Sequence, residues 1–461
     1  MKKIILIVII CTVVNVVSFA QTIAPADSLM GATILSKRTD AAMQKWRDNR
    51  FGQFIHWGLY AVPGGQWRGN DYPGAAEWIK ADAHISSAEY AGLIHQFNPQ
   101  KYNPTEWARI AKNMGVKYVI LTTKHHEGFC LWPSSFTDFS VASTPYKKDL
   151  LMPFVKAYQK EGIDVYFYYS ILDWHHPDYR SIIQSDDDQK AFERYFAFVK
   201  NQLKELITTY PNIKGLWFDG QWEASYKKNY KMGYELEQYC RALKPGIILN
   251  NRIRTDAQGH VDHDYRGRHF GDFDGSFERR LPSNVKSLDF DWEACMTVPE
   301  NQWGYHKIWQ GHTKTPYEIE EMLATCTAMG GNFVLNFGPQ PDGTIRTYEQ
   351  NLAKEVGAWM KTNSAAIYGC DNAGLEKQDW GYFTQKPGDD KLYMIVFNIP
   401  VSKALKLKLP EKTSIADNSL LTDSLQKFTI EKTYGNEYYL HLGEAKFTQP
   451  FVIALQLKKD R

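Results

Sequence analysis

Cysteine is scarce in this sequence and widely scattered, which excludes two classes of protein. Six cysteines occur in 461 residues, and Cys11 lies in an apolar N-terminal segment. The other five show neither the even count of a disulfide framework nor the CxxC spacing of a zinc site. We therefore expect these five to be small, buried apolar side chains: Cys130, Cys240, Cys295, Cys326 and Cys370.

The sequence also lacks an excess of either charge. Its 54 basic and 52 acidic residues give a formal charge of +2, and the two signs are interspersed. Nucleic acids and acidic membrane surfaces attract concentrated positive charge, so neither is expected as the main partner. A neutral partner is expected instead. The aromatic content of 14% fits a sugar, because flat rings stack on sugar faces, although packing accounts for most aromatics in a large protein.

The N-terminal apolar run is too short to cross a bilayer as a helix. Ile4 to Val17 spans about 14 residues, whereas a membrane-spanning helix needs about 20. The run follows two lysines and precedes Ser18-Phe19-Ala20, with small residues at both positions that determine cleavage. We predict that residues 1–20 are a signal peptide and that the mature chain has no membrane span. Export to the periplasm or exterior of a bacterium is expected.

The rest of the chain is long enough for two domains, which we expect at 21–362 and 363–461. In the first, short β-rich runs alternate with helical patterns. Strands are expected at 51–58, 117–126, 163–170, 214–220, 246–252, 288–296 and 332–339, and helices at 104–115, 149–162, 191–210 and 317–331. This alternation predicts an α/β fold, a (β/α)₈-like (TIM-type) barrel, with an open doubly wound sheet as the alternative.

Two regions differ from the barrel pattern. Residues 253–287 are expected to form a long loop. Beyond about residue 365 the pattern changes to short alternating β segments, at 391–399, 404–410, 437–443 and 451–459. These predict a C-terminal antiparallel β-sandwich. The sandwich either binds carbohydrate or braces the barrel, and bracing is favoured because no aromatic platform is evident.

Polar residues stand at the ends of several expected strands: His56, His125, His126, Tyr168, Tyr169, Asp219 and Arg252. In a barrel the carboxyl ends of the strands share one face, so these side chains are expected to converge on one pocket. Four tryptophans are near enough in sequence to line it, namely Trp57, Trp132, Trp217 and Trp222. Asp219 alone also fits a structural carboxylate that caps a helix or pairs with a cation. The other polar strand ends favour a role in the pocket.

The His125-His126 pair raises the question of a metal. Adjacent residues on a strand point to opposite faces, so at most one would face a shared ion unless the strand has ended. The sequence has no HExxH helix, and residues 173–179, DWHHPDY, show no ligand spacing. We therefore expect no metal and no cofactor, and neutral imidazoles beside an arginine instead suit the binding of sugar hydroxyls.

Hydrolysis of a glycoside needs two carboxylates, and Asp219 supplies only one. Glu278 is the first candidate for the second, because it lies in a glycine-containing segment expected to be a mobile loop at the pocket mouth. Arg279 and Arg280 follow it, and a salt bridge to either would lower its pKa. Glu293 is the reserve candidate, within an apolar β run where a buried structural carboxylate is expected.

Taken together, these motifs resemble the α-L-fucosidase family of retaining glycoside hydrolases (glycoside hydrolase family 29). The resemblance covers nearly the whole mature chain, in FGQFIHWGLYAVP, AAEWI, TKHHEGFCLW, YYSILDWHHPDY, GLWFDGQW, DWEACMTV, WGYH and GGNFVLNFGPQPDGTI. It implies the same barrel and C-terminal β-sandwich. It also implies Asp219 as nucleophile, Glu278 as acid/base, and a set of fucose-binding residues: His56, Glu77, Trp78, His125, His126, Tyr168, Trp217 and Arg252.

The activity implied by this resemblance is exo-acting hydrolysis of terminal α-L-fucosyl residues from fucosylated oligosaccharides or glycoconjugates. Double displacement would retain the anomeric configuration. Two alternatives stand beside it. A non-catalytic fucose-binding relative would need neither Asp219 nor Glu278, and both are present. A metal-dependent hydrolase would lose activity with a chelator, whereas a fucosidase of this type would not.

Overall fold

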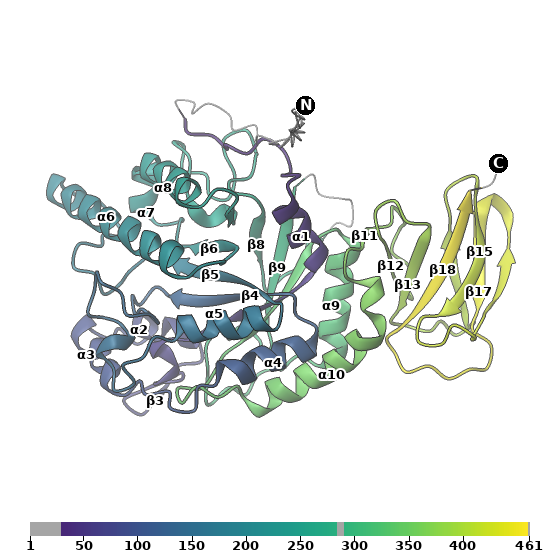
Figure 1. The fold of residues 1–461 in the computed structure, drawn as a ribbon, viewed down its shortest axis with the longest axis horizontal. Helices are drawn as coiled ribbons and strands as arrows, with labels where there is room; N and C mark the ends of the chain where they lie inside the picture. Colours follow the sequence, from purple (N-terminus) through teal and green to yellow (C-terminus); the bar gives the residue numbers. More distant parts are fainter. Residues whose placement is uncertain (1–28, 284–289, 460–461) are drawn as a thin grey trace, which may run out of the picture.

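The protein is described from a computed structural model over residues 29–283 and 290–459, so the predicted signal peptide lies outside the described residues. One eight-stranded parallel sheet runs in the order β7-β6-β5-β4-β1-β10-β9-β8 (Figure 1). Its strands are β1 (Phe51–Ile55), β4 (Tyr118–Lys124), β5 (Asp164–Ser170), β6 (Gly215–Asp219), β7 (Ile248–Leu249), β8 (Asp274–Glu278), β9 (Trp292–Thr297) and β10 (Asn332–Phe337). A small hairpin, β2 (Gln66–Trp67) and β3 (Asn70–Asp71), interrupts the connection from β1 to β4.

The sheet curls into a barrel whose last gap, between β7 and β8, is spanned by a short contact. Asn250 and Phe273 form an isolated parallel bridge. The backbone N–H of Asn251 donates to the carbonyl of Phe273 at 3.0 Å, and that of Asp272 donates to the carbonyl of Leu249 at 2.7 Å. The expected barrel is therefore confirmed, and the open doubly wound sheet is not what forms.

The α-helices lie around the barrel, and the first of them packs Met43 and Trp46 into the cluster inside it. They are α1 (Ala41–Asn49), α2 (Ile79–Asp82), α3 (Ser87–Ala91), α4 (Pro104–Met114), α5 (Leu151–Lys160), α6 (Asp186–Thr209), α7 (Ala224–Lys228), α8 (Tyr230–Leu243), α9 (Pro316–Ala328) and α10 (Thr347–Asn363). Local sequence explains several of their ends. In α4, Asn103 caps the first turn, Pro104 occupies its start, and Gly115 ends it with a φ of 97°. No described helix is both long enough and apolar enough to cross a bilayer.

The expected long loop at 253–287 is wrong in one important respect, because it contains the strand β8. Residues 274–278, DGSFE, have the composition of a turn rather than of a strand. They form a strand because they pair with β9, with an irregular register between Asp274 and Phe277. Tertiary pairing outweighs local propensity here, so Glu278 lies at the end of a strand instead of in a loop.

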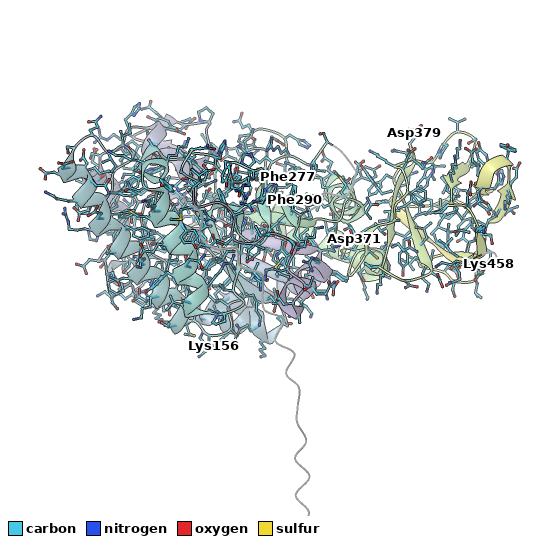
Figure 2. All side chains as sticks on the ribbon, turned by 90° about the horizontal axis from the view of Figure 1, so that it is seen from above. Lys156, Phe277, Phe290, Asp371, Asp379 and Lys458 are labelled. Atoms are coloured by element: carbon cyan, nitrogen blue, oxygen red, sulfur yellow. The ribbon has the colours of Figure 1, made fainter. Side chains whose placement is uncertain are left out.

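The C-terminal segment forms two antiparallel sheets with a shared core, which confirms the sandwich. One has the order β11-β12-β13-β18-β15 and the other β14-β17-β16. The strands are β11 (Asp371–Asn372), β12 (Gly381–Gln385), β13 (Lys391–Val396), β14 (Ala404–Lys408), β15 (Thr413–Leu420), β16 (Thr429–Lys432), β17 (Glu437–His441) and β18 (Phe451–Lys459). Figure 2 shows this smaller lobe beside the barrel, with Asp379 and Lys458 in it and Asp371 at the junction.

Strand β13 is buried on both faces and so joins the two lobes. Met394 packs into the sandwich core, whereas Tyr393 and Ile395 belong to the core of the barrel domain. Two hydrogen bonds cross the same junction. Tyr317 of α9 donates to the carbonyl of Phe397 at 3.0 Å, and Trp359 of α10 donates to that of Pro450 at 2.9 Å. This shared packing fits a bracing role for the sandwich.

The five cysteines at 130, 240, 295, 326 and 370 are buried and free, as expected.

A buried network of charges supports the barrel where β7 and β8 meet. Glu237 on α8 is fully buried and accepts from Arg254 at 2.7 Å and from Arg241 at 3.0 Å. Arg241 also reaches Asp272 at 3.2 Å. Burial raises the pKa of Glu237, but Arg254 and Arg241 together outweigh burial and lower this pKa to about 2.

We expect Glu237→Ala to lower the free energy of unfolding by about 3–5 kcal/mol, because it leaves the buried Arg254 guanidinium without its carboxylate partner, whereas Arg241 keeps Asp272. Since the folded pKa of Glu237 is below the unfolded one, its contribution is present above about pH 4.5 and is lost as the pH falls towards 2. Urea unfolding from pH 7 to pH 3 measures both effects.

The matched control is Glu235→Ala on the same helix. Glu235 pairs with Lys200 but is exposed, so its loss should change the free energy of unfolding by less than about 1 kcal/mol. An equal effect of the two substitutions would contradict the role given to the buried network.

Candidate active site

A cavity of about 590 Å³ opens at the carboxyl ends of the strands. The structure brings all ten sequence-predicted site residues to its wall: His56, Glu77, Trp78, His125, His126, Tyr168, Trp217, Asp219, Arg252 and Glu278. They come from segments far apart in the sequence. Asp219 and Glu278 are the last residues of β6 and β8, and Arg252 follows β7 in the short helix η5 (Asn251–Ile253). Glu77 and Trp78 end η2 (Ala76–Trp78), in the long connection after β1.

Asp219 is held by three neighbours in the wall of this cavity. Its Oδ1 accepts from Arg252 Nη1 at 2.9 Å, and its Oδ2 accepts from the Tyr168 hydroxyl at 3.0 Å. His126 Nε2 lies 3.7 Å from the same Oδ2. Burial raises the pKa of Asp219 to about 6, with Arg252 opposing the rise and Glu278 adding to it. The side chain of Asp219 is therefore held in one orientation, and its pKa lies close to neutral pH.

Glu278 is held by the other terminal nitrogen of the same guanidinium. Its Oε2 accepts from Arg252 Nη2 at 3.0 Å, and Arg279 Nε lies 3.7 Å from Oε1. Burial raises the pKa of Glu278, but Arg252 and then Arg279 and His56 leave that pKa below its usual value. The pKa-lowering salt bridge considered for Arg279 and Arg280 is thus made mainly by Arg252. Release from Arg252 is needed before Glu278 can hold a proton at neutral pH.

Glu293, the reserve candidate, does not line the cavity. Its side chain is buried beneath Trp217, where it accepts from the Trp217 indole at 3.1 Å and from the Tyr118 hydroxyl at 2.7 Å. Burial raises its pKa to about 7, against the effect of these two hydrogen bonds. Glu293 orients Trp217, over which the Arg252 guanidinium lies 5.0 Å from the ring. It therefore supports the wall without reaching the cavity.

The three histidines of the cavity are neutral near pH 7. Burial lowers the pKa of His56 to about 4 and that of His126 to about 3, and it lowers the pKa of His125 well below the usual range. Both His125 and His126 line the cavity because β4 ends at Lys124, so the alternation of a strand no longer applies.

Glu77 is a further buried carboxyl of the cavity. Its Oε2 accepts from the Gly304 N–H at 2.9 Å, and burial raises its pKa to about 7.

Three residues predicted near this cavity lie elsewhere. Tyr169 points away from it and donates to Gln202 on α6 at 2.8 Å, because its neighbour Tyr168 takes the inward face of β5. Trp57 packs against other aromatic rings outside the barrel, and its indole donates to the Gln340 carbonyl at 3.1 Å. Trp132 donates to Glu205 at 2.7 Å. Trp222 and Trp217 line the cavity as expected.

Sequence reasoning did not place nine further residues in the wall: Phe54, Gln221, Val261, Asp262, Ser276, Arg279, Arg280, Cys295 and Trp303. Trp303 lies within the WGYH segment and tilts against His56 with ring centroids 4.9 Å apart. Its place in that motif is the only signal in the sequence that could have found it. Among the described residues no group of three or more His, Cys, Asp or Glu side chains is placed to hold a metal ion.

Comparison with known proteins gives one consistent family. The sequence model of the alpha-L-fucosidase family matches residues 17–365. An alpha-L-fucosidase of Branchiostoma floridae is 30% identical over 403 residues, which cover 82% of this chain and 84% of the relative. The crystal structure of a family 29 alpha-L-fucosidase from Bacteroides thetaiotaomicron is 49% identical, with a TM-score of 0.91 over 95% of this chain and 98% of that one.

A second structure of a family 29 alpha-L-fucosidase from Bacteroides thetaiotaomicron is 50% identical to this chain. It has a TM-score of 0.90, covering 93% of this chain and 98% of that one. It holds a covalent intermediate with 2-fluoro-fucosyl fluoride, trapped in a glutamate-to-glutamine mutant.

We expect Arg252→Gln to raise the pKa of both carboxyl groups that this arginine holds. Burial then acts on Glu278 without its main opposing cation, so its pKa should move from below to above its usual value. The pKa of Asp219 should rise above about 6. Titration of ¹³C-labelled carboxyl groups by NMR measures both shifts.

Arg266→Gln is the control, since Arg266 is exposed and contacts Tyr265 rather than either carboxylate. Unchanged titration of Glu278 in Arg252→Gln would show that Arg252 does not set its charge.

Proposed function

This chain belongs to the alpha-L-fucosidase family and is an enzyme of that family, and we propose that it removes terminal α-L-fucosyl residues from glycans with retention of configuration. The observation that carries the proposal is the placement of Asp219 and Glu278 on one guanidinium, in a cavity lined by neutral histidines and aromatic rings. One arginine that bridges two carboxylates keeps them close. This suits the separation of about 5–5.5 Å in retaining enzymes better than the wider spacing of inverting ones.

In the first step Asp219 attacks the anomeric carbon and the bond between that carbon and the leaving oxygen breaks. Glu278, protonated on its release from Arg252, donates its proton to that oxygen. In the second step Glu278 takes a proton from water, whose oxygen displaces Asp219 and releases fucose. The charge on Asp219 explains the change of role. While ionised, it raises the pKa of Glu278, and once esterified it no longer does, so the pKa of Glu278 falls and its carboxylate is ionised and able to accept the proton of water.

The walls of the cavity suit a six-deoxy sugar. Neutral His56, His125 and His126 and the carboxyl of Glu77 offer donors and acceptors to hydroxyl groups. Phe54 and Trp303, whose ring centroids lie 6.0 Å apart, supply an apolar surface for the methyl group. A cavity of about 590 Å³ fits the exo-acting removal of one terminal sugar.

The signal-like segment supports a proposal of export to the periplasm or exterior of a bacterium. We expect the secreted form to begin at Gln21, and N-terminal sequencing of the protein recovered outside the cytoplasm measures this. A protein retained in the cytoplasm with residues 1–20 intact would contradict export.

The nucleophile is tested with 4-nitrophenyl α-L-fucoside. We expect Asp219→Gly to lower kcat by roughly 10⁴-fold, a loss typical of removing a nucleophile, and azide to restore part of the activity as fucosyl azide forms. Near-normal hydrolysis by Asp219→Gly would mean that Asp219 is a structural carboxylate.

The acid/base is tested by comparing Glu278→Gln with Glu293→Gln. Glu278→Gln should lower kcat on a fucosylated oligosaccharide by about 10²–10⁴-fold, the usual contribution of a general acid. It should also accumulate a covalent adduct with 2-fluoro-fucosyl fluoride, visible by mass spectrometry. Glu293→Gln should change stability more than turnover, because Glu293 does not reach the cavity. The reverse pattern would assign the acid to Glu293.

A further inference from the structure

Two of the three histidines in the cavity, His56 and His126, have a hydrogen-bond partner at Nδ1. Each imidazole has two nitrogens, and the partner of one nitrogen determines which of them is protonated. His56 Nδ1 lies 2.7 Å from the side-chain oxygen of Asn336. The Asn336 amide nitrogen donates to the Trp303 carbonyl at 2.7 Å, so this oxygen is oriented to accept. His56 therefore carries its proton on Nδ1 and presents Nε2 as an acceptor.

His126 follows the same pattern with Ser170. His126 Nδ1 lies 2.7 Å from Ser170 Oγ. The Ser170 hydroxyl has the Leu172 carbonyl at 3.1 Å as an acceptor, and its oxygen accepts from the Leu172 N–H at 3.0 Å. Nδ1 of His126 is thus engaged by Ser170, and Nε2 lies 3.7 Å from Asp219 Oδ2.

His125 has no such partner within hydrogen-bond distance among the described residues, although its Nδ1 is buried. The carboxyl nearest to it is that of Glu127, with Oε2 at 3.8 Å from Nδ1. Both oxygens of Glu127 also lack a hydrogen-bond partner in the described part of the chain, and its side chain is fully buried. Buried polar groups are almost always paired, so three unpaired atoms facing one another indicate a contact that forms in the working protein.

The local backbone makes room for this carboxyl behind His125. Gly58 faces it, and a Cβ atom at that position would lie 2.7 Å from Glu127 Oε1. Lys80 and Asp173 are the charged groups around it. Burial raises the pKa of Glu127 to about 8, with Asp173 adding to the rise and Lys80 opposing it. A neutral carboxyl still accepts a hydrogen bond through its carbonyl oxygen, and no step of the proposed mechanism uses this group.

We propose that Glu127 is a positioning residue that accepts the Nδ1 proton of His125, so that Nε2 of His125 faces the sugar as a hydrogen-bond acceptor. This rests on the proposed function, because the sugar is the ligand that His125 meets. The distance of 3.8 Å is longer than a hydrogen bond, and hydrogen bonds of active sites often shorten when the ligand binds. His56 and His125 then both present an unprotonated Nε2 to the cavity, each fixed by a different side chain.

The kinetic test compares Glu127→Gln and Glu127→Leu on 4-nitrophenyl α-L-fucoside. Glutamine keeps an acceptor of the same shape as a neutral carboxyl, so kcat/KM should stay within about threefold of wild type. Leucine has similar bulk but accepts nothing, and kcat/KM should fall about tenfold or more, mostly through KM. Tyr90→Phe is the matched control, because it removes a buried hydroxyl near Glu127 and leaves His125 unchanged. This hydroxyl has no hydrogen-bond partner among the described residues, and Glu127 contributes to raising its pKa.

Equal activity of Glu127→Leu and wild type would overturn the proposal. An inert wild type would instead contradict the proposed function, so the two failures are distinguishable.

The second measurement needs no variant and stands even if Glu127→Leu does not fold. A neutron crystal structure of the deuterated wild-type protein with a fucose-shaped iminocyclitol shows which nitrogen of His125 carries deuterium. The expected result is deuterium on Nδ1, with Glu127 Oε2 within about 3.2 Å. Deuterium on Nε2 alone, or a Glu127 carboxyl turned away from His125, would overturn the proposal.

Discussion

The active centre of this protein depends on one guanidinium. Arg252 holds Asp219 at 2.9 Å and Glu278 at 3.0 Å with its two terminal nitrogens. The guanidinium lies over Trp217, and Glu293 orients Trp217 from below. A planar donor with fixed geometry sets the direction of both carboxylates at once, which a lysine in its place would not do. The mutual placement of the two reacting groups therefore depends on where β7 ends.

The end of β7 is fixed by side chains, because this strand consists of only two residues and so makes few backbone hydrogen bonds to its neighbours. Asn250 takes the place of a strand neighbour. Its amide nitrogen donates to the Phe218 carbonyl at 2.9 Å, and its oxygen accepts from the Phe218 N–H at 2.7 Å. Asn251 does the same on the other side, donating to Asp274 at 2.8 Å and accepting from the Gly275 N–H at 2.9 Å. Two amides thus complete the pairing that short strands leave unfinished, immediately before Arg252 in the chain.

Sequence alone predicts the parts of this arrangement that depend on local pattern. Apolar runs locate seven of the eight barrel strands, and the polar residues at their ends include His56, Asp219 and Arg252. The missing strand, β8, exists through pairing with β9, and a composition of DGSFE gives no sign of that. The inward turn of Tyr168 and outward turn of Tyr169 depend on register, which a single sequence leaves open. Glu77 and Trp78 came only from the family resemblance, because they lie in a connection with no periodic pattern.

The charge balance of the cavity links this architecture to the chemistry. Burial holds the pKa of Asp219 at about 6 and that of Glu77 at about 7, while His56 and His126 stay neutral. The histidines of the resting cavity therefore add no charge to the ion pairs of Arg252, which suits a neutral sugar. A glycosidic transition state develops positive charge on the sugar ring, and this charge lowers the pKa of the surrounding carboxyls. Ionised Asp219 attracts that charge only as it develops, so stabilisation grows as the reaction proceeds and is weak in the bound ground state. Arg252 and Tyr168 hold Asp219 in one orientation beforehand, so this carboxylate needs little reorganisation when the charge appears, and burial strengthens its attraction by excluding water.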